Sequence, residues 1–323
     1  MDTDERYIRR CIELARNGLG NVQPNPMVGA VIVCDGQIIG EGYHQKYGEP
    51  HAEVNAINSV EDKSLLRKST IYVSLEPCSH YGKTPPCADK LIEMGFPRVV
   101  IGSTDPNEKV NGKGIAKLRA AGIDVTVGVL KEECDELNKR FFTYHLKKRP
   151  YVILKWAQTA DGYMDIDRTA NPHGKYWITN EKVKILTHRW RSEEQAILIG
   201  YTTYVHDRPQ LTTRLWPGKS PARYIACQNP ETAEPVEGFT LVPEEPEAAL
   251  QRLYDDKMQS VIIEGGRKTL DRYISSGLWD EARVLTGNQM WGAGTEAPKI
   301  AGGTCVEAFN IDDNRVEIEI TFN

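Results

Sequence analysis

The chain has 323 residues, which is long for one domain, so its length indicates two domains. Its net charge of −5 at pH 7 and pI of about 5.9 argue against non-specific binding to nucleic acid or anionic membranes. Residues 1–18 lack the apolar core of a signal peptide, and no apolar run approaches the roughly 20 residues of a membrane span. We therefore expect a cytoplasmic protein.

In the first half of the chain, apolar runs rich in β-branched residues alternate with amphipathic stretches. The runs are typical of strands and the stretches of helices, and Asp35-Gly36 is a typical turn between two antiparallel strands. This alternation predicts an α/β layered domain. The expected elements are a helix at 4–17, strands at 27–33 and 37–44, a helix at 51–60, a strand at 70–75, a helix at 87–95, a strand at 98–105, a helix at 114–122 and a strand at 123–130.

A basic segment at 146–150 predicts the boundary between domains at 1–147 and 148–323. A second alternating pattern begins at Tyr151 and predicts another α/β domain. Pro, Glu and Ala dominate residues 229–249, which we interpret as a surface excursion. Later strands are expected at 195–200, 222–227, 260–264, 282–286 and 315–322.

The chain contains seven cysteines, an odd number, and shows no export signal, which argues against a disulfide framework. Most of them are interpreted as small buried hydrophobic residues. Cys78 and Cys87 differ, because both lie in "EPCSHYGKTPPC", where a Pro-Pro pair stiffens the loop. By themselves the two thiols are open to three interpretations: a disulfide, a zinc site or no joint role.

A metal site becomes the favoured interpretation once His51 and Glu53 are considered. Both open the helix expected at 51–60, where side chains of a first turn can converge on a point beyond the helix end. Cys87 also opens a helix, and a helix N-terminus favours the thiolate. One imidazole and two thiolates give tetrahedral zinc three protein ligands and one open position, which is typical of a catalytic site. Zinc activates water near neutral pH, and Glu53 is the carboxylate available to move the proton.

The combination of "HAE" and "EPC" follows the pattern of zinc deaminases, but the second cysteine comes nine residues after the first. The loop "PCSHYGKTPPC", with "PNPMVGAVIV" (24–33) and "STDPN" (103–107), resembles the riboflavin-biosynthesis deaminases of the cytidine-deaminase-like superfamily. The resemblance implies a three-layer α/β/α domain with Glu53 as the catalytic residue. It also implies substrate contacts from Asn25, His44, His80, Lys83, Thr84, Asp105 and Asn107.

Other interpretations of these residues exist. A structural zinc site usually has four ligands and a closer cysteine pair. Two unrelated core cysteines would stand beside the His-Ala-Glu segment only by coincidence. Taken one at a time, His44, His80, Lys83 and Thr84 could be solvated loop residues.

The second half lacks a G-x-G-x-x-G fingerprint. The strand at 260–264 runs into Gly265-Gly266, and glycines after a strand let backbone N–H groups approach a phosphate. Lys155, Arg191 and Arg214 are cationic residues suited to a sugar phosphate, although each alone reads as a surface charge.

Four segments carry a second resemblance: "LKWAQTADG", "YWIT", "HRWRSEEQAILIGYTTYVHDRPQLTTR" and "IIEGGRKTL". They are similar, in order and spacing, to the pyrimidine reductase half of the bifunctional riboflavin-biosynthesis deaminase-reductases. The resemblance implies a dihydrofolate-reductase-like α/β domain that uses NADPH. The implied substrate residues are Lys155, Thr179, Arg191, Asp207, Arg214 and Glu264. The implied cofactor residues are Ala157, Trp177, Thr203, Gly265 and Gly266.

The chain departs from this family pattern at three positions. Thr202 stands where the family commonly has a glycine, Arg208 where it has an acid, and Gln195 where it has an aspartate. Thr202 belongs to the expected cofactor loop, so these departures bear on cofactor binding more than on the zinc chemistry.

The sequence thus predicts a zinc hydrolase and NADPH-dependent oxidoreductase in one chain. It would deaminate 2,5-diamino-6-ribosylamino-4(3H)-pyrimidinone 5′-phosphate and then reduce the ribosyl group to ribityl. The expected partners are small phosphorylated pyrimidines, and a second copy of the chain is a further candidate partner. Two alternatives stay open. A nucleic-acid base deaminase would need a basic face and stacking aromatic residues. A deaminase with an inactive C-terminal half would release ammonia without using NADPH.

Overall fold

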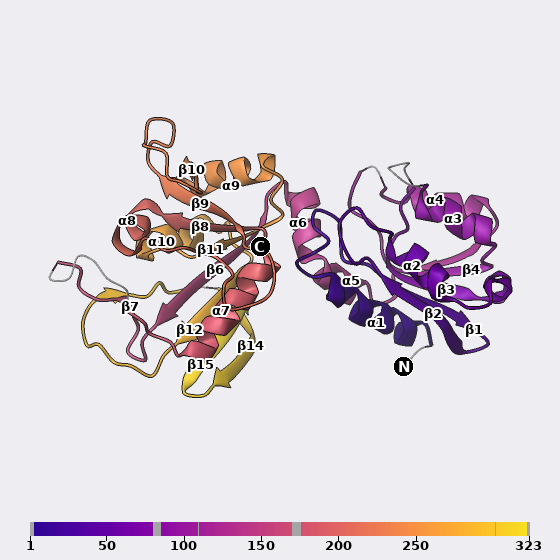
Figure 1. Ribbon diagram of the computed structural model, residues 1–323, viewed down its shortest axis with the longest axis horizontal. Coiled ribbons are helices and arrows are strands. Elements are labelled where there is room, and N and C mark those ends of the chain that lie inside the picture. The colour runs from indigo at the N-terminus through magenta and orange to yellow at the C-terminus, as the bar shows by residue number, and fades with distance from the viewer. Residues whose placement is uncertain (1–2, 80–84, 109, 170–175, 301, 322–323) are drawn as a thin grey trace. The chain divides into compact units, whose positions relative to one another are not determined.

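The computed structural model describes residues 3–79, 85–108, 110–169, 176–300 and 302–321. The chain forms two compact units, Met1–Lys147 and Lys148–Asn323, called the N-terminal and C-terminal domains below. Figure 1 shows that each unit is a sheet covered by helices, so the prediction of two α/β domains is confirmed. Within the described segments, every helix is too short or too polar to cross a membrane.

The N-terminal sheet has the order β2-β1-β3-β4-β5, with β1 antiparallel to its neighbours and β3, β4 and β5 parallel. Its strands are β1 (Gly29–Cys34), β2 (Gln37–Tyr43), β3 (Thr70–Leu75), β4 (Arg98–Ser103) and β5 (Asp124–Val127). Its helices are α1 (Thr3–Ala15), α2 (Ala52–Ser59), α3 (Cys87–Met94), α4 (Lys113–Ala120), α5 (Lys131–Leu137) and α6 (Lys139–Lys147), with 3₁₀ turns at Arg16–Gly18 and Lys63–Lys68.

The two faces of this sheet carry separate apolar cores. Successive side chains of a strand point to opposite faces, and β1 follows this rule. Ile32 packs in a core with α2, α3 and α4, whereas Val31 and Val33 pack in a core with α1 and α5. Figure 1 shows the same arrangement, with α3 and α4 on one side of the sheet and α1 and α5 on the other. The result is the three-layer α/β/α domain that was predicted.

The C-terminal sheet is mixed, with the order β10-β9-β8-β11-β6-β12-β15-β14. Only the pairs of β15 with β12 and β14 are antiparallel. Its strands are β6 (Tyr151–Gln158), β8 (Ala196–Gly200), β9 (Ala222–Cys227), β10 (Thr240–Pro243), β11 (Ser260–Ile263), β12 (Glu281–Thr286), β14 (Thr304–Ile311) and β15 (Asn314–Ile320), and β7 (Tyr163–Asp165) pairs with β13 (Thr295–Glu296) apart from it. Its helices are α7 (Glu181–Glu193), α8 (Tyr201–Asp207), α9 (Pro246–Asp255) and α10 (Arg267–Ser276).

This sheet is also covered on both faces. Leu154 and Trp156 of β6 pack in a core with α9 and α10, whereas Tyr151 and Ile153 pack in a core with α7. The central strands are therefore continuously apolar, as is typical of parallel strands buried on both sides.

The interpretation of residues 229–249 as a surface excursion is wrong for its second half. β10 adds to the sheet edge, and Pro246 occupies the first turn of α9, where proline is tolerated because its missing N–H would be unpaired there anyway. β14 was not predicted either. It lies at the opposite edge with mostly exposed side chains, so it lacks the apolar alternation that reveals a strand.

A buried ion network holds β12 against α7. Arg283 is 5% exposed, and its guanidinium contacts Glu281 at 2.6 Å and Glu194 at 3.4 Å. The same guanidinium lies 4.7 Å from the centre of the Trp190 ring. Charges are tolerated in such a place only when they are paired, and losing one partner is costly.

We expect Arg283→Leu to lower the free energy of unfolding of the C-terminal domain by about 3–5 kcal/mol, because two buried carboxylates would then face an alkyl side chain. All six tryptophans lie in this domain, so urea unfolding followed by tryptophan fluorescence reports on it selectively. Arg315→Leu is the control, because it breaks an exposed pair with Glu317 and should cost at most about 1 kcal/mol. Equal losses for the two variants would contradict the assignment.

Candidate functional site

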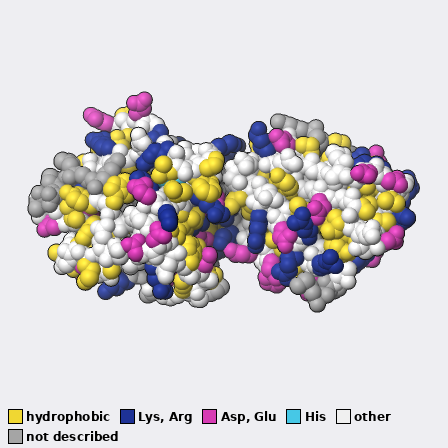
Figure 2. Space-filling view, turned by 60° about the horizontal axis from the view of Figure 1, so that its bottom comes forward, with side chains coloured by type: hydrophobic (Ala, Val, Ile, Leu, Met, Phe, Trp, Pro, Cys, Tyr) yellow, Lys and Arg dark blue, Asp and Glu magenta, His cyan; other side chains and the backbone are white. Residues whose placement is uncertain are grey.

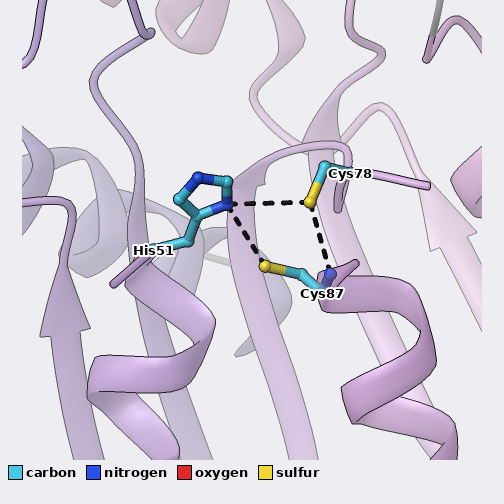
Figure 3. A group of neighbouring side chains, drawn as sticks. All are labelled: His51, Cys78 and Cys87. Carbon is cyan, nitrogen blue, oxygen red and sulfur yellow. Dashed lines mark hydrogen bonds between the residues drawn. The ribbon is translucent and has the colours of Figure 1, made fainter. Parts of the chain in front are cut away.

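Figure 3 shows three side chains that converge on one point in the N-terminal domain. His51 is the residue before α2, Cys87 is the first residue of α3, and Cys78 follows β3. The His51 Nδ1 atom lies 3.6 Å from the Cys78 sulfur and 3.4 Å from the Cys87 sulfur. All three potential ligand atoms lie within 4.8 Å of one another. The structure therefore brings together the three residues that the sequence predicts as zinc ligands.

These distances fit a tetrahedral zinc ion. Zinc bonds of about 2.3 Å to sulfur and 2.0–2.1 Å to nitrogen at the tetrahedral angle put a nitrogen and a sulfur about 3.6 Å apart. The Cys87 thiol and the His51 ring interact with the Cys78 sulfur and lower the pKa of Cys78, which favours the thiolate that a metal binds. The backbone N–H of Cys87 also donates to that sulfur at 3.3 Å. All seven cysteines are free thiols, so the disulfide interpretation is wrong.

Glu53 lies in the first turn of α2 and is 3% exposed. Burial raises the pKa of its carboxyl, while the charge of His51 and a hydrogen bond from Cys87 oppose that effect. The carboxylate thus borders the His51–Cys78–Cys87 cluster, as a proton-transfer residue requires.

The residues expected to contact substrate in this domain fall into three groups. Asn25 Nδ2 lies 3.1 Å from His44 Nε2, and the His44 ring packs edge-on against the His51 ring with centres 5.2 Å apart. Asp105 accepts a hydrogen bond from the backbone N–H of Asn107 at 2.8 Å, and burial raises its pKa to about 6. His80, Lys83 and Thr84 lie outside the described residues.

The C-terminal domain contains a cavity of about 790 Å³ at the carboxyl ends of β6, β8, β9 and β11. Cavities of this size bind small molecules and cofactors. Every residue that the sequence assigned to the reductase lines it: Lys155, Ala157, Trp177, Thr179, Arg191, Thr203, Asp207, Arg214, Glu264, Gly265 and Gly266.

An ion cluster forms one wall of this cavity. Glu264, which follows β11, contacts Lys155 at 2.9 Å and Arg191 at 2.5 Å. Burial alone would raise the pKa of Glu264, but the charges of Arg191 and Lys155 outweigh it and lower the pKa to about 2. Arg191 Nε is buried without a hydrogen-bond partner among the described residues. Such a donor in a cavity wall is typical of a site that receives an anionic or polar ligand.

Beside this cluster the backbone of Gly265 and Gly266 approaches α8 and α10 closely. A Cβ atom on Gly265 would lie 2.7 Å from Thr269, so only glycine fits there. The N–H of Gly266 donates to Thr203 Oγ1 at 3.0 Å, which connects the starts of α8 and α10. A helix N-terminus beside a cavity suits the phosphates of NADPH, so the described residues fit this cofactor.

Among the lining residues that sequence reasoning missed are His188 and Arg168. His188 lies one helical turn before Arg191 on α7, and its Nδ1 accepts the backbone N–H of Arg214 at 3.1 Å. Burial and the charges of Arg191 and Arg214 lower the pKa of His188 to about 4. Arg168 also lines the cavity and contacts Asp207 at 3.3 Å. His188 could have been found from its spacing of three residues to Arg191, which places both side chains on one face of α7. No comparable sequence signal pointed to Arg168.

The three departures from the family pattern occupy different places. Thr202 lines the cavity without a positive φ angle, so a threonine is not strained there. Arg208 ends α8 with φ of 42° and stacks on Tyr204. Gln195 accepts the backbone N–H of Gln259 at 2.7 Å, next to the amino-terminal ends of β8 and β11 and away from the cavity.

Comparisons with known proteins give the same assignment for both domains. Residues 1–103 match the cytidine and deoxycytidylate deaminase zinc-binding region, and residues 150–318 match the RibD C-terminal domain. The riboflavin biosynthesis protein RibD of Aquifex aeolicus is 36% identical, over 98% of this chain and 96% of that protein. The Bacillus amyloliquefaciens RibD is 39% identical, over 93% and 88%.

Solved structures that resemble this chain support the same assignment. The structure of a diaminohydroxyphosphoribosylaminopyrimidine deaminase/5-amino-6-(5-phosphoribosylamino)uracil reductase from Thermotoga maritima superposes with a TM-score of 0.89, is 36% identical and covers 99% of both chains. The RibD of Acinetobacter baumannii has a TM-score of 0.87 and 30% identity, again over 99% of both chains.

We expect Cys87→Ser to lose most of the zinc bound by the purified chain, because the thiolate is the softer and stronger ligand. Elemental analysis of wild type and variant measures the loss directly. Cys134→Ser is the matched control, because Cys134 is buried in α5 among apolar residues. Full zinc in Cys87→Ser would remove Cys87 from the metal site.

Proposed function

This chain belongs to the RibD family of riboflavin biosynthesis proteins, and from that membership we propose which of its residues carry out the two reactions. It is a bifunctional enzyme with a zinc-dependent deaminase domain and an NADPH-dependent reductase domain. The proposed substrate is 2,5-diamino-6-ribosylamino-4(3H)-pyrimidinone 5′-phosphate, whose deaminated product is then reduced at the ribosyl group. The observation that carries this proposal is that one chain holds both a three-ligand cluster and a cation-lined cavity.

In the deaminase, His51, Cys78 and Cys87 would hold the zinc ion. When bound, zinc supplies the Lewis acidity that makes water a nucleophile near neutral pH. Glu53 would take the proton of the water that attacks the pyrimidine carbon and pass it to the exocyclic nitrogen, which leaves as ammonia. The burial of Glu53 next to the cluster supports this role.

The substrate ring would be oriented by Asn25 and by Asp105. The Nδ1 atom of His44 lies 3.1 Å from the carbonyl of Pro50, which can only accept, so Nδ1 carries the proton and Nε2 accepts from Asn25. This leaves Asn25 Oδ1 to accept a hydrogen bond from a substrate N–H group. Asn107 joins Asp105 in the same loop, and His80, Lys83 and Thr84 complete the proposed set.

In the reductase, Lys155, Arg191 and Arg214 would bind the sugar phosphate, with Glu264 fixing the first two. Ala157, Trp177, Thr203, Gly265 and Gly266 would position NADPH, which supplies the hydride that reduces C1′ of the opened sugar. Thr179 and Asp207 would also contact the substrate, with Asp207 held by Arg168. The presence of all these side chains around one cavity supports the assignment.

The alternatives considered from the sequence are less well supported. On the face shown in Figure 2, Lys and Arg side chains are interspersed with Asp and Glu, unlike the continuous basic surface that a nucleic-acid deaminase needs. An inactive C-terminal half is less well supported because Lys155, Glu264 and Arg191 form a complete ion cluster that lines the cavity. A cytoplasmic location and a homo-oligomeric state stay predictions.

We expect Glu53→Gln to reduce ammonia release from the diamino substrate by about 10²–10⁴-fold, because the variant has no base to transfer the proton. Its zinc content should equal that of wild type, since Glu53 is not a ligand. Glu61→Gln, an exposed position near the end of α2, is the control. Normal ammonia release by Glu53→Gln would exclude the proposed role.

We expect the purified chain to oxidise NADPH only when the deaminated ribosylamino-pyrimidine phosphate is added, as followed by NADPH absorbance. Glu264→Gln should lower kcat/KM by about 10²-fold or more, because Lys155 and Arg191 lose the charge that aligns them. Its ammonia release should be unchanged, and Glu231→Gln on the surface should behave as wild type. A wild-type chain that releases ammonia but never uses NADPH would instead favour an inactive reductase domain.

A further inference from the structure

A buried carboxylate close in sequence to the metal cluster has no part in the reactions above. Glu76 follows the last residue of β3, two positions before Cys78, and is 4% exposed. Burying a carboxylate is costly unless its oxygens are hydrogen-bonded. The groups that donate hydrogen bonds to the Glu76 carboxylate therefore indicate its role.

Four backbone N–H groups donate to this carboxylate. Oε1 accepts from Gly114 at 2.9 Å and from Ile115 at 3.2 Å. Oε2 accepts from Gly112 at 2.9 Å and from Asp105 at 3.3 Å. Three of the donors form the N-terminus of α4, where N–H groups lack partners within the helix and the helix dipole favours a negative charge. The fourth belongs to the loop that follows β4.

That fourth hydrogen bond connects two parts of the proposed deaminase site. The segment of Glu76 carries the cluster residue Cys78, and the loop after β4 carries Asp105 and Asn107. The backbone N–H of Glu76 also donates to the carbonyl of Ser103 at 2.9 Å. Glu76 thus contacts the last residue of β4 through its backbone and the loop after β4 through its side chain.

Neither the carboxylate of Glu76 nor the glycine at position 114 can be substituted without disturbing these contacts. Each oxygen accepts two N–H groups, so an amide in its place would point an NH₂ group at two donors. A Cβ atom on Gly114 would lie 2.2 Å from the carbonyl oxygen of Pro77 and 3.2 Å from Glu76 Oε1. The first turn of α4 therefore packs closely against the segment that leads to Cys78.

We propose that Glu76 is a positioning residue of the deaminase, whose carboxylate holds the Asp105–Asn107 loop in register with the His51–Cys78–Cys87 cluster. This inference rests on the proposed function, because it takes Asp105 and Asn107 as substrate contacts. A role limited to capping α4 would instead change stability without a selective change in substrate binding.

The test is Glu76→Gln in the full chain, assayed by ammonia release and by elemental analysis. We expect KM for the diamino substrate to rise about 10- to 100-fold, because two donors lose their acceptor. We expect a much smaller change in kcat and an unchanged zinc content. Asp62→Asn is the matched control, because Asp62 caps the 3₁₀ turn at Lys63–Lys68 through Ser64 and should leave KM unchanged.

Hydrogen exchange followed by mass spectrometry gives a readout independent of activity. The amides of Asp105, Gly112, Gly114 and Ile115 should exchange faster in Glu76→Gln and not in Asp62→Asn. If Glu76→Gln does not fold, Glu76→Asp, which keeps the charge on a shorter side chain, should still raise KM above the wild-type value while its zinc content stays unchanged.

Unchanged KM or loss of zinc in Glu76→Gln would overturn the inference, the latter because Glu76 would then position the metal ligand. A wild-type chain that binds zinc but releases no ammonia would refute the proposed function itself, so the two failures are distinguishable.

Discussion

Parallel strands that end at one edge of a sheet are the constraint on which both sites depend. In the N-terminal domain β3 and β4 end side by side, and the chain leaves them at Glu76 and at Thr104. In the C-terminal domain β6, β8 and β11 end at the edge where the cavity opens. Because the strands already fix this edge, short segments after each strand suffice to bring distant residues together. Two unrelated chemistries can therefore use one architectural principle.

The two sites handle buried charge in different ways. Around His51, Cys78 and Cys87, potential ligand atoms are placed at the spacing of a metal coordination sphere, which a bound cation would complete. Around Glu264, the protein supplies its own cations, and the pKa of about 2 keeps that carboxylate ionised across the physiological range. The first site needs an ion to be complete, whereas the second is organised before its ligands arrive.

Much of this could be predicted from the sequence, because the informative residues lie in short contiguous segments. His51 and Glu53 are two positions apart in the chain, and the expected first turn of a helix places both at the cluster. The same reasoning failed where a role depends on residues far apart in sequence. Glu76 was interpreted only as part of the "EPC" segment, because the backbone N–H groups that donate to its carboxylate lie up to 39 positions away in the sequence. Arg168 contacts Asp207, which lies 39 positions away in the sequence, and no local pattern predicts such a pair.

The sequence also failed to predict the two edge strands of the C-terminal sheet, and the reason is again physical. β14 exposes most of its side chains and β10 has four residues, so neither carries an apolar period long enough to separate it from a loop. Both contribute to the edges of the sheet, while the cavity lies at the ends of its central strands. Buried central strands carry the strongest sequence signal and also position the functional residues. A sequence can therefore reveal the chemistry of such a domain while leaving its outline incomplete.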